Sequence, residues 1–314
     1  MTTHKIKKGL DLPLAGRPDQ VLTDAAEPTS VALETYEFAG IKPKVLVKEG
    51  DEVETGQPVF LNKVDRDIVW CAPASGTVRA IEFGPRRFLT RVVIDVGPDK
   101  QHAALPKLPQ SGDREELIRA IKGAGLWPLF KQRPLGKMPV GEAAPVAIFV
   151  NGMDSAPLAA DPCFATHDRP ADLQAGVDVL ARLTSGTVYL ALREAGDHQS
   201  DARGLEGVEV HEFNGPHPAG LVGTHIHEIR PLKSGEVAFA VSLQDVARIG
   251  HWARTGSYPT HKVIAVGGSE APSKQYFRVR QGAPLAVLTG GAALTGDVRC
   301  INGDVLHGYA AEPD

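Results

Sequence analysis

Cysteines, long apolar runs and excess positive charge are all scarce in this sequence, and each scarcity excludes a class of protein. Three isolated cysteines in 314 residues cannot build a disulfide framework or hold an iron–sulfur cluster. No stretch reaches the about 18 consecutive apolar residues of a transmembrane helix. The formal net charge is −4, and the brief basic runs at 5–8 and 86–87 lack the stacking aromatics of a nucleic-acid site. We therefore expect no electron-transfer cluster, no membrane span and no nucleic-acid partner.

A secretory signal is also missing, because Gly9, Asp11 and Pro13 interrupt the apolar stretch that such a signal needs. The composition, 42% hydrophobic and 23% charged, is that of a folded globular chain. The 33 glycines and 24 prolines favour many short strands over long helices. We expect a cytosolic, multidomain chain. It stops at Asp314 soon after a strand-like stretch, which is consistent with trimming of a longer protein.

Hydrophobic periodicity divides the chain into domains at 1–100, 101–255 and 256–314. Residues 44–96 alternate apolar and polar positions between turn signals, which predicts a compact β module. The last segment again has short strand-like runs, and we expect strands there at 262–266, 276–279 and 285–288.

The middle segment alternates helix and strand, which predicts a doubly wound α/β domain. Its first helix is expected to be capped by Asp113, and its last helix to start near Leu243 and end before Gly256. The expected strands are 146–150, 187–192, 208–213 and 237–241, with a further helix at 172–183.

The β module resembles biotinyl/lipoyl carrier domains in its sequences EGDEV at 49–53, GQP at 56–58 and APASGTV at 72–78. In such domains a lysine at an exposed hairpin tip carries the prosthetic group. Lys63 is the nearest candidate, but it lacks the usual flanking methionines and lies too near the first strand. We therefore interpret the module as an unmodified barrel used as a scaffold, with a carrier modified at Lys63 as the alternative.

The middle domain lacks the three-glycine loop that brings backbone N–H groups to a pyrophosphate. Residues 151–155 contain one glycine, and the glycine-rich stretch 215–223 has neither dinucleotide nor P-loop spacing. We interpret 215–223 as a structural turn whose glycines need positive φ, with an anion or flavin cradle as the alternative. Asp154 and Asp161 could act as a functional pair, although capping is the favoured interpretation.

Three histidines within eleven positions raise the question of a metal site. If 225–227 were a strand, His225 and His227 would lie on one side of it, near His217. No acidic ligand accompanies them at a metalloprotease-like spacing, and histidines bonded to backbone carbonyls are common. We therefore assign no metal ligand, and no residue of this chain is assigned as catalytic.

Five stretches together resemble the A (alpha) component of the bacterial Na⁺-translocating NADH:quinone oxidoreductase. Their order and spacing extend over nearly the whole chain, and GPHPAGLVGTHIHEI is the most specific of them. They are 5–13 (KIKKGLDLP), 45–60 with 72–78, 154–161, 215–229 (GPHPAGLVGTHIHEI) and 255–268, which ends in VIAVGG.

The resemblance implies an α/β multidomain fold: a biotinyl/lipoyl-carrier-like β barrel, a Rossmann-like domain and a small SLBB-type β-grasp domain. It implies a peripheral subunit on the cytoplasmic face of the inner membrane, in a complex that passes electrons from NADH to ubiquinone and exports Na⁺. NADH, flavins and iron–sulfur centres would belong to partner subunits, through which alone this chain would reach the membrane. The chain itself would bind no redox cofactor and be inactive alone. The family also carries a mostly helical C-terminal region that this sequence lacks.

Ubiquinone is the ligand that the resemblance allows for this chain, but no short motif defines its site. A quinone needs an apolar slot and a hydrogen-bond donor for its carbonyl oxygen. The quinone-proximal candidates are therefore the turn and its histidines: Gly215, His217, Gly220, Gly223, His225 and His227. Two rival interpretations are a protein like the C component of the Rnf complex and an autonomous flavin- or NADH-binding oxidoreductase.

Overall fold

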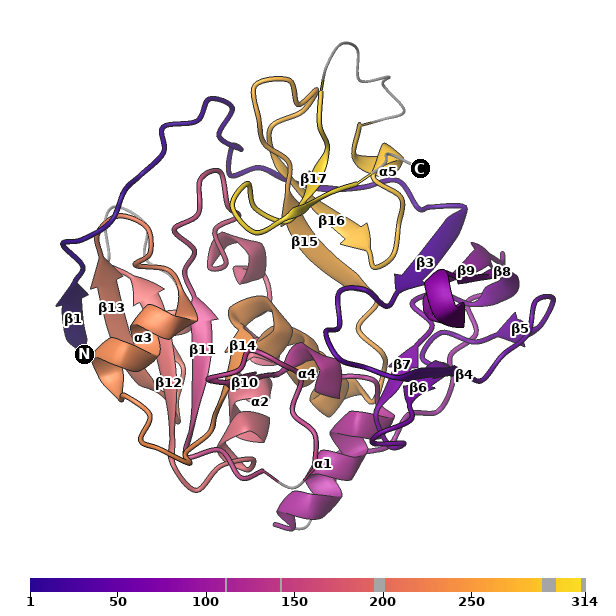
Figure 1. The fold of residues 1–314 in the computed structure, drawn as a ribbon, viewed down its shortest axis with the longest axis horizontal. Coiled ribbons are helices and arrows are strands. Elements are labelled where there is room, and N and C mark those ends of the chain that lie inside the picture. The colour runs from indigo at the N-terminus through magenta and orange to yellow at the C-terminus, as the bar shows by residue number, and fades with distance from the viewer. Residues whose placement is uncertain (111, 142, 195–200, 290–297, 312–314) are drawn as a thin grey trace.

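The computed structural model describes residues 1–110, 112–141, 143–194, 201–289 and 298–311. An α/β unit lies at the left and lower centre of Figure 1, a β barrel at the right and a small β unit above them. The core is largely continuous, because one cluster of buried side chains joins the barrel, the first helix and one face of the α/β sheet.

The α/β unit is built on a largely parallel sheet with the order β1-β13-β12-β11-β14-β10. Its parallel inner strands are β11 (Ala147–Gly152), β12 (Thr187–Arg193), β13 (Glu209–Asn214) and β14 (Ala238–Ser242), and β10 (Lys131–Arg133) is the antiparallel edge strand. Helices α2 (Pro170–Ala181) and α4 (Leu243–Thr255) cover one face, and α3 (Val222–Ile229) covers the other. The strand β11 is buried on both sides because Ile148 and Phe149 point to opposite faces. The predicted doubly wound arrangement is confirmed.

Local signals explain where two of the helices begin and end. Helix α1 (Arg114–Gly123) starts at the predicted cap, where the side chain of Asp113 accepts a hydrogen bond from the Glu115 N–H. Helix α4 starts at Ser242, whose side chain accepts from the Asp245 N–H, and ends at Gly256 in the left-handed conformation with φ 68°. The short 3₁₀ turns are η1 (Pro85–Arg87), η2 (Trp127–Leu129), η3 (Phe164–Thr166) and η4 (Asp201–Gly204).

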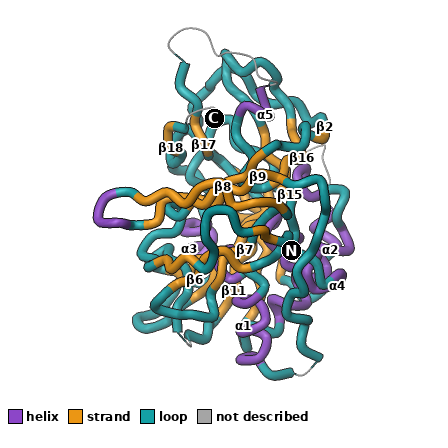
Figure 2. Tube along the Cα trace, turned by 90° about the vertical axis from the view of Figure 1, so that its right-hand side faces the viewer, coloured by secondary structure: helices purple, strands orange, loops and turns teal. Residues whose placement is uncertain are grey.

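The barrel consists of two small antiparallel sheets around a common core. One sheet contains β3 (Ser30–Glu34), β9 (Leu89–Val96), β8 (Gly76–Phe83) and β5 (Glu52–Val53), and the other contains β4 (Pro43–Val45), β6 (Pro58–Asn62) and β7 (Val69–Cys71). Phe60 stacks on Trp70 between them, which buries both rings. Figure 2 shows the β8–β9 hairpin standing out from the body of the molecule.

The small β unit corrects one prediction. Its strands are β15 (His261–Ala265), β16 (Tyr276–Arg280), β17 (Ile301–Asn302) and β18 (Tyr309–Ala310). The sequence predicts a further strand at 285–288, but α5 (Ala286–Thr289) is helical, and its Leu288 packs on Phe277 and Val279. A run of four apolar residues has no periodicity of its own, so tertiary packing decides its conformation.

The first residues of the chain pair with the other two units rather than with the barrel. Strand β1 (Thr2–Lys5) lies parallel to β13, and β2 (Leu22–Asp24) lies parallel to β16. The segment between them crosses the molecule along its upper left side in Figure 1. The domain boundaries at 100 and 255 stay predictions.

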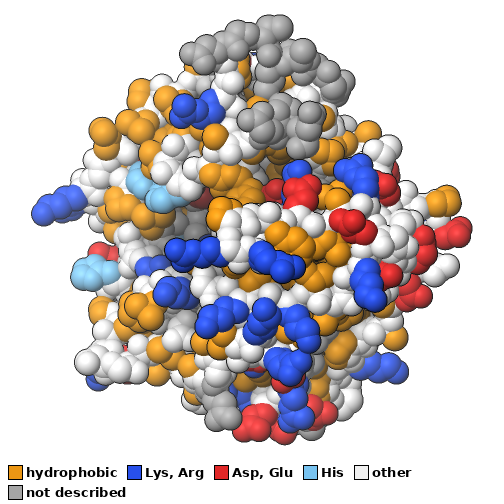
Figure 3. Space-filling model, turned by 45° about the vertical axis from the view of Figure 1, so that its right-hand side comes forward, with side chains coloured by type: hydrophobic (Ala, Val, Ile, Leu, Met, Phe, Trp, Pro, Cys, Tyr) orange, Lys and Arg blue, Asp and Glu red, His pale blue; other side chains and the backbone are white. Residues whose placement is uncertain are grey.

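Charge is distributed unevenly over the surface. Figure 3 shows Lys and Arg side chains gathered in a band down the middle of one face, beside exposed hydrophobic side chains. None of the helices within the described residues combines the length and apolar character that crossing a bilayer requires.

Candidate functional site

The predicted turn 215–223 lies at the carboxyl end of β13, close to the carboxyl end of β11. Ligands of open α/β sheets bind outside the carboxyl ends of the strands, so this is the edge on which a site is expected. The Asn151 side chain at the end of β11 donates a hydrogen bond to the carbonyl of Gly220, 3.2 Å away. The turn is therefore anchored to the central strand of the sheet.

Ser155 holds the imidazole of His217. The N–H of Gly220 donates to Ser155 Oγ at 2.7 Å, and Ser155 Oγ lies 3.1 Å from Nδ1 of His217. A hydroxyl has one hydrogen and two lone pairs, so Oγ, which already accepts from Gly220, can either donate its hydrogen to Nδ1 or accept one from it. When Oγ donates to Nδ1, a ring with a single N–H carries it on Nε2, which has no hydrogen-bond partner among the described residues. His217 is half-buried, so this N–H is available to a ligand.

Two distant segments of the chain surround His217. The N–H of Leu10 donates to the His217 carbonyl at 3.0 Å, and the Asp11 carboxylate accepts from the His217 N–H at 3.1 Å. From the C-terminal side, the ring of His307 lies 6.3 Å from that of His217, centroid to centroid. Leu10 is 68% exposed, and Leu306, beside His307, is 43% exposed. The two segments that adjoin His217 thus each carry an exposed leucine.

Two carboxyl groups, those of Asp154 and Asp304, belong to the segments that adjoin His217. Burial is the main cause of a raised pKa at Asp154, and the charge of nearby Asp304 raises it further. Burial acts to raise the pKa of Asp304. The N–H groups of Leu306 and His307 donate hydrogen bonds to its carboxylate, however, and the pKa is lowered overall. The pKa values of the two carboxyl groups are therefore shifted in opposite directions.

The histidines 225 and 227 do not lie on a strand as expected. They belong to α3, where residues two apart point in very different directions. His225 is fully buried against Phe213, and its Nε2 lies 2.8 Å from the Ala219 carbonyl oxygen. Burial lowers the pKa of His225 to about 4, so the ring is neutral. His227 is exposed. Of the three histidines, His217 is the one that lies beside Ser155, Asp11 and His307.

The glycines of the turn are required chiefly by close packing, which corrects the expectation of positive φ throughout. Only Gly215 has positive φ, at 132°, and a Cβ there would lie 2.1 Å from the Ile6 carbonyl oxygen. A Cβ on Gly220 would lie 2.4 Å from the Ser155 nitrogen, and one on Gly223 would lie 3.3 Å from Arg133 Nη2. The turn therefore packs tightly on Ile6, which follows β1, and on the loop after β11, and it lies beside the Arg133 side chain.

The same packing leaves little room for a nucleotide at the end of β11. A Cβ on Gly152 would lie 2.5 Å from a Leu192 methyl group, and Met153 is buried. Asp161 accepts from the N–H groups of Cys163 and Phe164 in the turn before η3, whose N-cap position is Cys163. Asp154 likewise accepts from the Ala156 N–H. Both aspartates are therefore engaged in local turns.

The metal and carrier hypotheses can also be compared with the geometry. Within the residues described, no group of three or more His, Cys, Asp or Glu side chains could hold a metal ion. Lys63 is exposed in the β6–β7 turn, but Asp65 of that turn lies 2.7 Å from the Lys122 ammonium of α1. The turn is thus docked on α1, unlike the free tip of a carrier domain.

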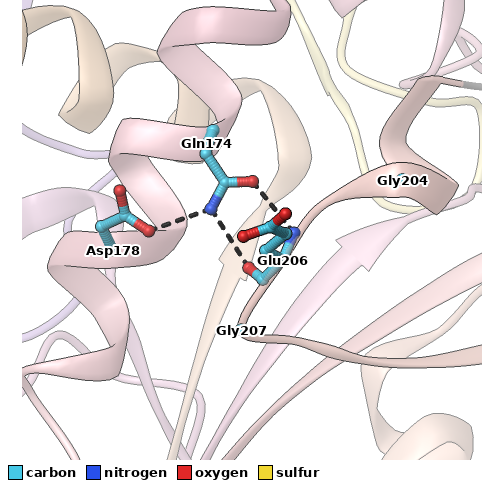
Figure 4. Close-up of a pocket in the computed structure, with 5 residues that line it drawn as sticks. All are labelled: Gln174, Asp178, Gly204, Glu206 and Gly207. Carbon is cyan, nitrogen blue, oxygen red and sulfur yellow. Dashed lines mark hydrogen bonds between the residues drawn. The ribbon is translucent and has the colours of Figure 1, made fainter.

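A depression of about 570 Å³ lies beside α2, away from the turn 215–223. Figure 4 shows Gln174 at its centre, with its amide bonded to Asp178 and to the backbone of Glu206. These bonds use both ends of the amide to hold the loop before β13 against α2. We interpret the depression as a structural joint.

The similarity to known proteins extends over the same three units. The family described as NqrA N-terminal barrel-sandwich hybrid domain matches residues 4–97, NqrA second alpha/beta domain matches 112–258, and NQRA C-terminal domain matches 263–312. A protein of Neisseria meningitidis serogroup C, named as the A component of Na(+)-translocating NADH-quinone reductase, is 42% identical over 98% of this chain and 69% of its own length. The chain belongs to this NqrA family.

Two further relatives carry the same name and are similar to this chain over a similar length. Proteins of the same name from Hahella chejuensis and Yersinia pestis are 40% and 41% identical, each over 98% of this chain and 69% of their own length. The predicted resemblance and the predicted α/β multidomain fold are therefore confirmed. A chain from a structure of the NAD⁺-reducing [NiFe]-hydrogenase in the air-oxidized state has a TM-score of 0.42 and 14% identity, covering 62% of this chain and 41% of its own. That similarity is too weak to support a functional assignment.

Proposed function

We propose that this chain is the NqrA component of a Na⁺-translocating NADH-quinone reductase, peripheral to the membrane on its cytoplasmic face. It would bind no redox cofactor of its own, so electrons would come from NADH through partner subunits. Its proposed contribution is to hold the head group of a quinone next to His217. Family membership supports the first part of the proposal, and the geometry around His217 supports the last.

The observation that carries the quinone site is the chain of bonds from the Gly220 N–H through Ser155 Oγ to His217 Nδ1. In this proposal Ser155 donates to Nδ1, so that the Nε2–H of His217 is the oriented donor that a quinone carbonyl oxygen needs. The exposed side chains of Leu10 and Leu306 offer apolar contacts for the ring and its tail. Asp154, whose pKa is raised mainly by burial, is the nearby carboxyl group.

The absence of a redox cofactor is supported by the packing at the end of β11. Flavin and dinucleotide sites of this fold need backbone that approaches the phosphates freely. Here Gly152 and Gly220 are both packed closely against protein atoms. The turn 215–223 can accordingly serve as a support for His217 rather than as a cradle.

The test is to measure, by calorimetry, how tightly a short-chain ubiquinone analogue binds to the purified chain. We expect His217→Ala to weaken binding about tenfold, the loss of one oriented hydrogen bond to a ligand. His227→Ala is the matched control, because His227 is exposed on α3 and lies outside the cluster. Equal affinity of both variants and the parent chain would contradict the site, and flavin absorbance in the purified protein would contradict the cofactor-free role.

A further inference from the structure

The β8–β9 hairpin ends in a preformed tip, residues 83–88. The Gly84 N–H donates to the Phe88 carbonyl at 2.8 Å, and the Arg87 N–H donates to the Gly84 carbonyl at 3.1 Å. These bonds close the turn without help from the rest of the protein. Figure 2 shows the tip projecting away from the body, so its side chains are free to meet another surface.

The tip exposes two aromatic rings and two cations together. Phe83 is 54% exposed and Phe88 is 39% exposed, on either side of Arg86 and Arg87. Neither arginine has an ion pair or a side-chain hydrogen bond within the part of the chain that the structure describes. Both have positive φ, 57° and 56°, a conformation that glycine adopts more readily. Nothing in the fold requires arginine at these positions, which points to a role outside the fold.

Further cations have no ion pair among the residues that the structure describes, and we call them the basic band. They lie at β4, in the β6–β7 turn and at β10. Figure 3 shows Lys and Arg side chains gathered in a band on one face of the molecule. Lys63 and Lys42 are close neighbours, since the Lys63 N–H donates to the Lys42 carbonyl at 2.8 Å. Of the two carboxylates in the β6–β7 turn, Asp65 is paired with Lys122 and Asp67 is exposed. The basic band consists of Lys42, Lys44, Lys63, Arg66, Lys131 and Lys137, all exposed.

We infer that the hairpin tip and the basic band dock this chain on the anionic headgroups of a lipid bilayer. Phe83 and Phe88 would enter the boundary between headgroups and acyl chains, where aromatic rings are favoured. Arg86, Arg87 and the basic band would contact lipid phosphates. A projecting, convex tip suits a lipid surface better than an acidic peptide, which is usually recognised in a groove or at a sheet edge. The inference takes from the proposed function only that the chain works beside a membrane.

The test is co-sedimentation of the full chain with vesicles of phosphatidylcholine alone or with about one-third phosphatidylglycerol, at low and at physiological salt. We expect binding to the anionic vesicles only, weakened by salt. The double variant Arg86→Gly with Arg87→Gly should weaken it about tenfold while folding normally, because glycine accepts positive φ. Phe83→Ser with Phe88→Ser should also weaken it, and Arg86→Lys with Arg87→Lys should preserve it.

Lys7→Glu with Lys8→Glu is the matched control, since both lysines are exposed beyond β1 and away from the tip. This variant should bind anionic vesicles like the parent chain. Failure of the parent chain to bind anionic vesicles at low salt would overturn the inference. So would unchanged binding by both the Arg86→Gly, Arg87→Gly variant and the Lys63→Glu, Arg66→Glu variant. Quinone affinity separates the two proposals, because the tip variants should bind the quinone analogue normally.

Discussion

The carboxylate of Asp65 and the ammonium of Lys122 lie 2.7 Å apart, with side chains only 14% and 9% exposed. This pair fastens the β6–β7 turn of the barrel to helix α1 at the start of the α/β unit. The Lys122 ammonium also lies 5.6 Å from the centre of the Trp127 ring. Two units of the chain are therefore joined by a charge pair that is nearly shielded from water.

Removing one member of this pair should be costly. Lys122→Met keeps the stem that packs on Trp127 but leaves a nearly buried carboxylate alone, so we expect a loss of about 3 kcal/mol in the free energy of unfolding. Urea unfolding measures it. The double variant Asp65→Leu, Lys122→Met should lose less than the single variant, because no charge is then stranded. A double variant as unstable as the sum of both single variants would show that the two groups do not interact.

Ser155→Ala tests whether the serine positions His217. Without the hydroxyl, Nδ1 of His217 loses its hydrogen-bond partner, so the proposed preference for a proton on Nε2 is lost. We expect quinone-analogue affinity to fall about fivefold, the equivalent of about 1 kcal/mol.

A purely structural role would not move the tautomer of the ring. Nitrogen NMR of His217 should therefore show the proton on Nε2 in the parent chain and on both nitrogens in Ser155→Ala. Ser155→Thr, which keeps the hydroxyl, should restore the parent spectrum if the larger side chain is accommodated. An unchanged His217 spectrum in Ser155→Ala would refute the positioning role.

Much of the α/β unit is predictable because its signals are local. Asp113 and Gly256 mark helix ends by their own chemistry, and the buried strands are short apolar runs. Helix α3 escapes prediction because its N-cap, Leu221, makes no side-chain cap bond. Without that signal, the alternation in His225-Ile226-His227 wrongly indicates a strand.

The site is predictable only in part, for a different reason. His217 is a candidate because it stands in a glycine- and proline-rich turn. Its partners Ser155, Asp11 and His307 come from distant parts of the sequence, and only the fold brings them together. Likewise, β1 reaches β13 across most of the chain, where no local pattern could indicate it.

Acid should weaken the fold through buried histidine. His225 is fully buried and its pKa is lowered by burial to about 4, whereas an unfolded histidine has a pKa of about 6.5. Below pH 6.5 the unfolded chain takes up a proton that the folded chain refuses, so stability falls until the pH reaches about 4. We expect His225 alone to account for about 3 kcal/mol of this loss.

Urea unfolding at several pH values measures this loss, and His225→Gln should flatten the decline. Some decline should remain, because burial also lowers the pKa values of His4, His251 and His261. Stability curves of equal slope for the parent chain and His225→Gln would refute the assignment to His225.

The contact between α2 and α4 depends on two glycines. A Cβ on Gly250 would lie 1.8 Å from the Asp172 carbonyl oxygen, and one on Gly176 would lie 2.1 Å from the Val246 carbonyl oxygen. Because the clashing atoms are backbone atoms, no change of side-chain rotamer can relieve the clash. The two helices would have to move apart. Gly250→Ala should therefore lower the free energy of unfolding by about 3 kcal/mol, toward the upper end of overpacking effects.

Gly204→Ala is the matched control, since a Cβ there meets nothing within 4 Å and its φ is not positive. Thermal unfolding of the two variants should place Gly204→Ala at or slightly above the parent chain and Gly250→Ala well below it. If both variants melted with the parent chain, α2 and α4 would not be in the close contact that the structure gives them.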